Sequence, residues 1–202
     1  MPKQVDHDRR RADIAALVVG VIQREGAGSA TVRRVSQAGG FSMGVITHYF
    51  RDKDELIASA FEWLAAESFA ALGATLERAA PGRDRLQAAL EFMVPLTGER
   101  SYPAVWLSLW SGAMHNPALA GVHRQYYRRW RSILSRCVSE SVKHKQARTP
   151  GDARDAIDLL AAGVDGLWLA VTFEGRRFSV ARRRRLVTSL VDSVLGLERG
   201  VH

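Results

Sequence analysis

The chain has 202 residues, of which 47% are hydrophobic, and this is enough to bury a substantial core in one large or two small domains. Its six prolines and its lack of long alternating β-branched runs argue against a β protein and predict an all-α fold. The single cysteine, Cys137, excludes an intrachain disulfide, and the net charge of +8 suits either a nucleic-acid partner or solvated helix faces.

The N-terminal residues MPKQVDHDRRR lead into an amphipathic helix and not into an apolar signal core. This first helix carries Ile14, Val18 and Ile22 at helical spacing and is followed by Gly26. Further along, the most apolar stretch, residues 156–173, is interrupted by two aspartates and two glycines. We therefore expect a soluble cytoplasmic protein without a transmembrane helix and without a membrane partner.

Residues 31–55 are the most informative stretch, because they predict two short helices joined by a tight glycine turn. Thr31 is a good N-cap for the first helix, and Gly39 and Gly40 end it, since glycine adopts the left-handed conformation with little strain. Ser42 is expected to cap the second helix through its hydroxyl. A helix-turn-helix presents its second helix to the major groove of DNA.

The second of these helices is predicted over residues 43–50, with Ile46 and Phe50 facing inward. Four of its other residues are expected to face outward: Met43, Gly44, Thr47 and His48. Asp52 and Glu55 then form an acidic variant of a capping box for a helix that continues to about residue 79. The breaks that follow predict further helices over 84–96, from Pro103 to 114, from Pro117 to about 146, over 152–173 and over 181–198.

The run AGGFSMGVITHYFRDKDELIASAF resembles the end of the DNA-binding domain of TetR-family repressors. The residues that carry the resemblance match in order and spacing: Ser42, Ile46, Tyr49, Phe50, Lys53, Glu55 and Leu56. The preceding helix is similar to the first helix of that family, so the resemblance covers about the first 65 residues. One departure is Gly40-Phe41, where a Gly-Val pair is more common, and we expect only a packing adjustment there.

The resemblance implies which residues contact double-stranded operator DNA. Residues of the recognition helix would reach bases or adjacent backbone, while Tyr49 and Lys53 would contact phosphates. The expected contacts are Thr31, Arg33, Ser42, Met43, Gly44, Val45, Thr47, Tyr49 and Lys53. The recognition helix has no Arg, Asn or Gln, so specificity would depend on Thr47, thymine methyl contacts, Arg33 or DNA shape. His48 could either pack against the protein or contact DNA.

The last two predicted helices carry apolar faces too wide for one neighbour, with Leu160 and Val164 on the first and Leu186 and Leu190 on the second. The segment AAGVDGLWLAVTFEG resembles the C-terminal domain of the BetI-like branch of the TetR family, whose namesake responds to choline. This resemblance implies a homodimer whose two helix-turn-helix domains bind a pseudo-palindromic operator. The alternative is that the two helices form an ordinary core pair in a monomer.

Two domains are therefore predicted: a three-helix helix-turn-helix DNA-binding domain at 1–55 and a larger helical domain for effector binding and dimerisation at 56–202. Aromatic residues of the second domain could line a pocket for a small-molecule effector, and a nearby carboxylate would suit a cation. Aromatic residues at helical spacing are more often plain core residues. The candidates are Phe92, Tyr102, Trp106, Trp110, Tyr126, Trp130, Asp165 and Trp168.

No catalytic residue, metal site or cofactor is predicted, because Cys137 has no histidine at a convincing spacing and no phosphate-binding glycine loop is present. An alternative function is binding to anionic membranes, since residues 123–150 carry eight basic residues and one acidic residue. The sequence favours a ligand-responsive, homodimeric repressor that releases its operator when the effector binds.

Overall fold

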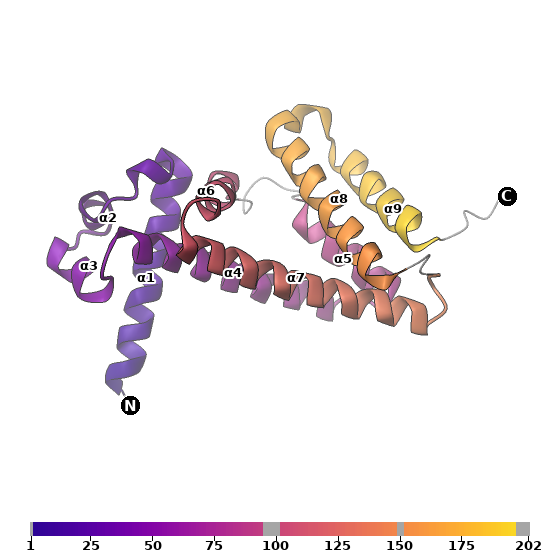
Figure 1. The fold of residues 1–202 in the computed structure, drawn as a ribbon, viewed down its shortest axis with the longest axis horizontal. Coiled ribbons are helices and arrows are strands. Elements are labelled where there is room, and N and C mark those ends of the chain that lie inside the picture. Colours follow the sequence, from indigo (N-terminus) through magenta and orange to yellow (C-terminus); the bar gives the residue numbers. More distant parts are fainter. Residues whose placement is uncertain (1, 95–101, 149–151, 197–202) are drawn as a thin grey trace. The chain divides into compact units, whose positions relative to one another are not determined.

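The computed structural model describes residues 2–94, 102–148 and 152–196, with side chains from residue 7 onward. The described residues form helices and no strand, which confirms the predicted all-α fold (Figure 1). The α-helices are α1 (Pro2–Glu25), α2 (Val32–Gly39), α3 (Met43–Tyr49), α4 (Lys53–Glu77), α5 (Arg83–Met93), α6 (Pro103–Ala113), α7 (Pro117–Lys143), α8 (Ala153–Glu174) and α9 (Val180–Leu195).

Packing divides the chain into two compact units. The N-terminal unit contains the described residues within 1–69 and 102–126, and the C-terminal unit contains those within 70–101 and 127–202. Helices α4 and α7 each contribute residues to both units. This division follows packing, and the functional boundary expected after residue 55 stays a prediction.

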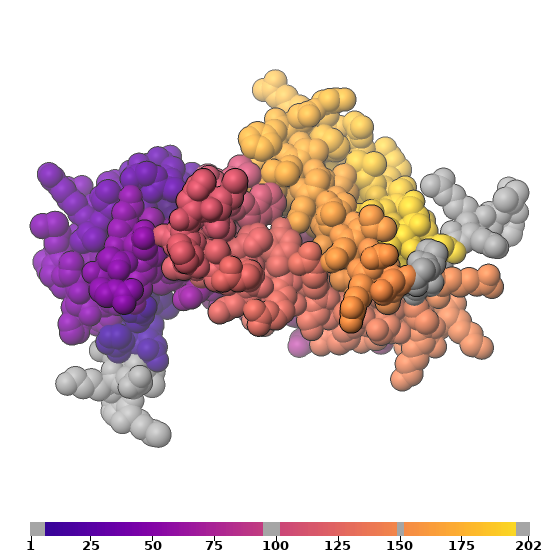
Figure 2. Space-filling model, in the orientation of Figure 1, coloured from indigo at the N-terminus to yellow at the C-terminus, as the bar shows by residue number. Residues whose placement is uncertain are grey.

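The N-terminal unit is built on one apolar core that fixes α3 against α1 and α4. Ile14 and Ile22 of α1, Ile46 of α3 and Phe61 of α4 are completely buried in this core. Burying a side chain of this size stabilises the fold by about 1.5–3 kcal/mol, so the recognition helix is held as part of a rigid body. In Figure 2 the indigo and purple atoms of α1, α2 and α3 lie together in this unit.

The ends of α2 agree with the sequence-based prediction. The Thr31 hydroxyl accepts a hydrogen bond from the Arg34 backbone N–H at 3.1 Å, as an N-cap does. At the other end Gly40 has a φ of 66°, the left-handed conformation that glycine adopts without a steric penalty. Phe41 then packs against the core and anchors the turn, as expected.

The start and end of α3 differ from the prediction. Ser42 occupies the N-cap position, but its hydroxyl makes no cap hydrogen bond; its backbone carbonyl accepts from the Val45 N–H at 3.0 Å. The predicted hydroxyl cap is therefore wrong, and the hydroxyl remains exposed. Phe50 has a φ of −134°, so it follows α3 as an extended C-cap residue and is not the last helical residue. Its ring is buried, as predicted.

Helix α6 consists mostly of apolar residues and is nevertheless only partly buried. Pro103 does occupy its first turn, but within the described chain only Val105 and Leu109 of this helix are fully buried. Its contacts with α1 cover one face, and Trp106 and Trp110 remain partly exposed. A mostly apolar composition therefore did not produce a fully enclosed helix.

The C-terminal unit packs α5, α8 and α9 with part of α7. Trp130 and Leu160 are completely buried in it, together with Val191 of α9. In Figure 2 the yellow atoms of α9 lie against the orange atoms of α8, in agreement with their direct packing. Helix α5 ends at Met93, two residues before Pro95. The last two residues of the predicted helix, 95 and 96, lie outside the described residues.

Two other predicted ends shift by a few residues. Helix α7 ends at Lys143, three residues before the predicted Gln146, and Lys145 follows with a φ of 56°. Helix α9 ends at Leu195 with Gly196 in the left-handed conformation, while the last predicted residues of this helix lie outside the described chain. Asp152 caps α8 by accepting from the Arg154 N–H at 2.8 Å.

Candidate DNA-binding site

Helix α3 has one buried face and one face open to solvent. Ile46 is completely buried, as is Phe50 just after the helix, whereas Met43 is 58% exposed. Gly44, Thr47 and His48 are exposed as well, so the orientation predicted for the helix is confirmed. A short helix that presents apolar and polar groups outward from a rigid support is the geometry that a major groove accepts.

The residues predicted to contact DNA lie mostly on this open surface. Thr31, Arg33 and Lys53 are exposed at the starts of α2 and α4. Val45 and Tyr49 are half-buried. The Thr47 hydroxyl lies 3.3 Å from the carbonyl oxygens of both Met43 and Gly44, to which it donates within α3, so its lone pairs remain available to a base donor. The structure brings these residues to one unit, and their contact with DNA stays a prediction.

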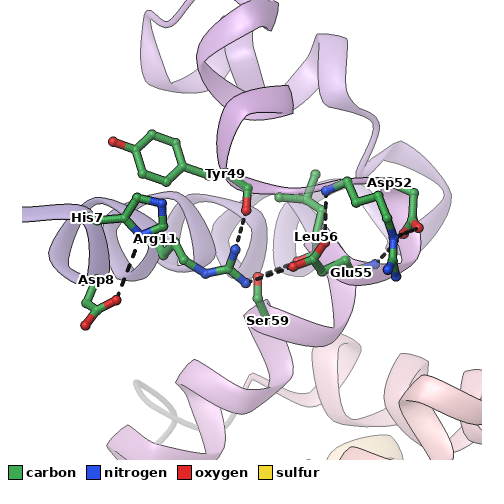
Figure 3. Close-up of polar contacts among 9 residues, drawn as sticks. His7, Asp8, Arg11, Tyr49, Asp52, Glu55, Leu56 and Ser59 are labelled. Atoms are coloured by element: carbon green, nitrogen blue, oxygen red, sulfur yellow. Dashed lines mark hydrogen bonds and ion pairs between the residues drawn. The ribbon is translucent and has the colours of Figure 1, made fainter. Parts of the chain in front are cut away.

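Arg11 of α1 joins the end of α3 to the start of α4. Its guanidinium donates to the Tyr49 carbonyl oxygen and, from the other terminal nitrogen, to Glu55 Oε1 at 3.1 Å (Figure 3). The same guanidinium carbon lies 4.5 Å from the centroid of the Phe50 ring. One side chain therefore satisfies a carbonyl at the C-terminus of α3 while it fixes the first turn of α4.

The predicted capping box of α4 exists in a modified form. The Glu55 N–H donates to Asp52 Oδ1 at 2.8 Å, as predicted, but Glu55 Oε2 accepts from the Arg51 N–H at 2.9 Å and not from that of Asp52. The hydrogen bond from the Arg51 backbone and then the contact with Arg11 hold the pKa of Glu55 below its usual value. Hydrogen bonds from the Glu55 backbone and from Arg51 lower the pKa of Asp52. Both carboxylates are therefore ionised at neutral pH.

An open hollow of about 590 Å³ lies beside α3, and Arg10 of α1 lines it together with Ser42, His48 and Tyr49. The Tyr49 ring contacts two imidazoles, with ring centroids 4.6 Å from His7 and 5.1 Å from His48, and the two imidazole centroids are 6.3 Å apart (Figure 3 shows His7 beside Tyr49). Sequence reasoning missed Arg10 and Arg11 as parts of this site. The only available signal was the run of three arginines, which does not tell which of them faces α3.

The effector residues predicted from aromatic content divide equally between the two units. In the N-terminal unit the Tyr126 ring centroid lies 4.7 Å from Trp106 and 5.1 Å from Phe69. Tyr102 and Trp106 also pack against the apolar core. These aromatic residues therefore act at least in part as core residues, and their role in a pocket stays a prediction.

In the C-terminal unit, Trp130 is completely buried, and its indole N–H has no hydrogen-bond partner among the described residues. Asp165 accepts a hydrogen bond from the Tyr127 hydroxyl at 2.6 Å. Burial raises the pKa of Asp165, and the Tyr127 hydrogen bond only partly opposes this. Trp168 is buried and Phe92 half-buried in the same unit. Burial disfavours the ionised form of this carboxyl, and a positive charge placed beside it would favour that form.

Neither a metal site nor a reactive thiol is found in the described part of the chain. No group of three potential ligand residues gathers there. Cys137 is buried, and burial raises the pKa of its thiol to about 11, so it is neutral and unreactive at neutral pH. By length and composition, α4 and residues 153–177 could each cross a membrane, a criterion that core helices of soluble proteins also meet.

Comparison with known proteins identifies two matching family models. Residues 19–60 match the bacterial regulatory proteins of the TetR family, and residues 81–196 match the C-terminal region of BetI-type transcriptional repressors. The HTH-type transcriptional regulator BetI of Stenotrophomonas maltophilia is 30% identical over 198 residues, which cover 95% of this chain and 96% of the relative. These families and this relative are transcriptional regulators, a non-enzymatic class.

Two solved structures share the fold. A transcriptional regulator from Pseudomonas aeruginosa superposes with a TM-score of 0.80 at 25% identity, covering 94% of this chain and 92% of its own. A regulator from Saccharomonospora viridis in complex with choline has a TM-score of 0.81 at 23% identity, covering 92% of this chain and 96% of its own. The resemblance of the whole fold therefore extends through both units.

Proposed function

Because the chain belongs to the TetR family of DNA-binding bacterial transcriptional regulators, we propose that it is a cytoplasmic homodimeric repressor that releases a pseudo-palindromic operator when a small cation binds. The observation that carries the DNA-binding part is the open face of α3, which lies opposite a completely buried Ile46. Phosphate contacts by Tyr49 and Lys53 would set the register, and Thr47 would influence base preference.

Dimerisation is supported by apolar side chains that the C-terminal unit leaves exposed. On α8, Leu159 is 60% exposed and Phe173 is 71% exposed. Leu186 and Leu190 of α9 are only half-buried. A second copy that covers these side chains would remove apolar surface from water, and its two-fold symmetry would match an operator with two half-sites.

Release of the operator follows from the continuity of α4. This helix starts directly after the helix-turn-helix, with the Asp52–Glu55 cap, and contributes its last residues to the C-terminal unit. An effector that favours one orientation of α4 would change the separation of the two recognition helices in the dimer. Adjacent major grooves on one face of DNA require this separation to be about 34–36 Å. The effector releases DNA only to the extent that it binds the conformation that does not fit the operator more tightly than the conformation that does.

A cationic effector is supported by Asp165, a carboxylate that burial destabilises in its ionised form. Buried aromatic rings, Trp130 and Trp168, belong to the same unit. An aromatic ring attracts a cation by about 0.5–2 kcal/mol, and a carboxylate adds a counter-charge. The similar regulator from Saccharomonospora viridis is in complex with choline, a quaternary ammonium compound.

The docking is tested by fluorescence anisotropy on the DNA upstream of the protein's own gene. Lys53→Ala should weaken binding and reduce the slope of log K against log salt concentration by about one for each subunit bound, because one phosphate contact is lost. Lys143→Ala removes the same charge from the exposed end of α7 and serves as the control. An unchanged slope for Lys53→Ala would mean that the docking is wrong.

The effector is tested by isothermal titration calorimetry with choline and betaine aldehyde. We expect Asp165→Asn to weaken binding at least tenfold, since the counter-charge is lost. Asp155→Asn is the matched control, because Asp155 is exposed in the first turn of the same helix. Absence of heat for all cations tested, polyamines included, would exclude the cationic effector but leave the DNA-binding assignment intact.

A further inference from the structure

The three consecutive arginines at residues 9–11 have different surroundings. Arg11 binds the Tyr49 carbonyl and the Glu55 carboxylate. Arg10 is exposed, its guanidinium carbon lies 5.7 Å from the centroid of the Phe41 ring, and it lines the hollow beside α3. Arg9 is exposed and does not line this hollow. Among the described residues Arg10 forms no ion pair, and its guanidinium stands next to the recognition helix.

The lining of the hollow is suited to an anion. Besides Arg10 it contains His48 and the hydroxyl-bearing residues Ser42 and Tyr49, and it contains no carboxylate. The Ser42 side chain is exposed and makes no cap hydrogen bond, and its hydroxyl can donate to a phosphate oxygen. Hydrogen bonds from a guanidinium and from hydroxyls to a phosphate oxygen are shorter and stronger than bonds between neutral groups.

The position of the hollow relates it to the DNA backbone. Ser42 precedes the first residue of α3 and Tyr49 is the last, so the hollow extends along the whole recognition helix. A helix of seven residues is about 10 Å long, which is close to the width of the major groove, about 12 Å. A helix inserted into that groove therefore has phosphates near its ends.

We propose that Arg10 binds a phosphate of the operator backbone in this hollow, which makes α1 a DNA-contacting element in addition to α2, α3 and the start of α4. The inference rests on the proposed docking of α3. The Phe41 ring holds the guanidinium beside α3, and the contact adds affinity without reading the sequence.

The test is anisotropy at several salt concentrations with a duplex that carries the operator and an unrelated duplex of the same length. Arg10→Ala should lower the affinity for both duplexes about tenfold. It should also reduce the salt slope by about one for each subunit bound. Arg10→Gln should repeat this result, whereas Arg10→Lys keeps the charge and should keep the slope. Arg9→Ala removes the same charge one residue away and should leave the slope unchanged.

Each possible outcome decides between the two proposals. If Arg10→Ala leaves the slope unchanged while Lys53→Ala reduces it, the docking stands and the assignment of Arg10 is wrong. If neither variant reduces it, both proposals fail. If Arg10→Ala weakens only the operator duplex, Arg10 reads bases or groove shape and the phosphate assignment is overturned. Unchanged thermal melting of the Arg10 variants excludes unfolding as the cause, since Arg10 is exposed.

Discussion

The surface around α3 and the proposed effector region of the C-terminal unit differ in how far their polar groups are exposed to solvent. Around α3, Ser42, Thr47 and Arg10 are exposed, and the apolar residues behind them form the support. In the C-terminal unit, Asp165 and the indole N–H of Trp130 are withdrawn from solvent, and only Asp165 has a described hydrogen-bond partner. Polar groups are thus at the surface in one region and inside in the other.

This difference corresponds to the size of the partner. Duplex DNA is a long polyanion that cannot enter a protein, so the groups that bind it must stand on an open and rigid surface. A small molecule can be enclosed, and enclosure strengthens each electrostatic contact with it. Enclosure destabilises the protein when no ligand is bound, because it keeps a carboxylate in an environment that disfavours its charge.

The largest expected effect on stability distinguishes the buried face of α3 from its exposed face. Ile46→Ala should reduce the free energy of unfolding by about 2–5 kcal/mol, because it removes a completely buried side chain and leaves a cavity. Met43→Ala, on the exposed face, should change it by less than about 0.5 kcal/mol. Chemical denaturation measures both, and a large loss for Met43→Ala would contradict the division between the two faces.

The next effect concerns the hydrogen bond between Tyr127 and Asp165, which is partly buried in the C-terminal unit. Tyr127→Phe should reduce the free energy of unfolding at pH 7 by about 1.5–3 kcal/mol, because it removes a hydrogen bond to a withdrawn carboxylate. The pKa of Asp165 should rise further, since this bond and the charge of Arg131 both oppose the rise that burial causes. Urea unfolding at pH 7 gives the loss, and a neutral result would show that water replaces the hydroxyl.

A smaller effect separates the two N-caps of the helix-turn-helix. Thr31→Ala should reduce the free energy of unfolding by about 0.5–2 kcal/mol, because the hydroxyl accepts a hydrogen bond from the Arg34 N–H. Ser42→Ala should leave stability nearly unchanged, since its hydroxyl makes no cap bond, and should still weaken operator binding. Equal destabilisation by both variants would mean that Ser42 caps α3 after all.

The smallest effect is a pH dependence from Asp165. Because folding raises the pKa of this carboxyl, the ionised form destabilises the folded state, and stability increases as pH falls through the folded pKa. Asp165→Asn keeps an acceptor for Tyr127 and should be slightly more stable at pH 7. This gain should shrink as pH approaches the usual aspartate value, and unfolding curves at pH 7 and at about pH 4 would show it. A gain that stays constant with pH would contradict the raised pKa.

Much of the helix-turn-helix could be predicted from local sequence. The Gly40 turn, the Thr31 cap and the inward Ile46 follow from residue chemistry and helical spacing, both of which act within a few residues. The Glu55 contact was predicted only in part, because its second partner was the backbone of Arg51 and its third was Arg11, which is distant in sequence. Hydrogen bonds between distant residues leave no periodic signal.

The sequence by itself determined that this protein is all-helical, where the recognition helix lies and which of its faces is apolar, since helical periodicity and capping are local properties. Only the tertiary structure distinguished Arg9, Arg10 and Arg11, because their different roles depend on how α1 packs against α3 and α4. Likewise, only packing decided that Asp165 is withdrawn from water next to Tyr127. Burial and long-range contact depend on the whole chain, so identical neighbours in sequence acquire different chemistry.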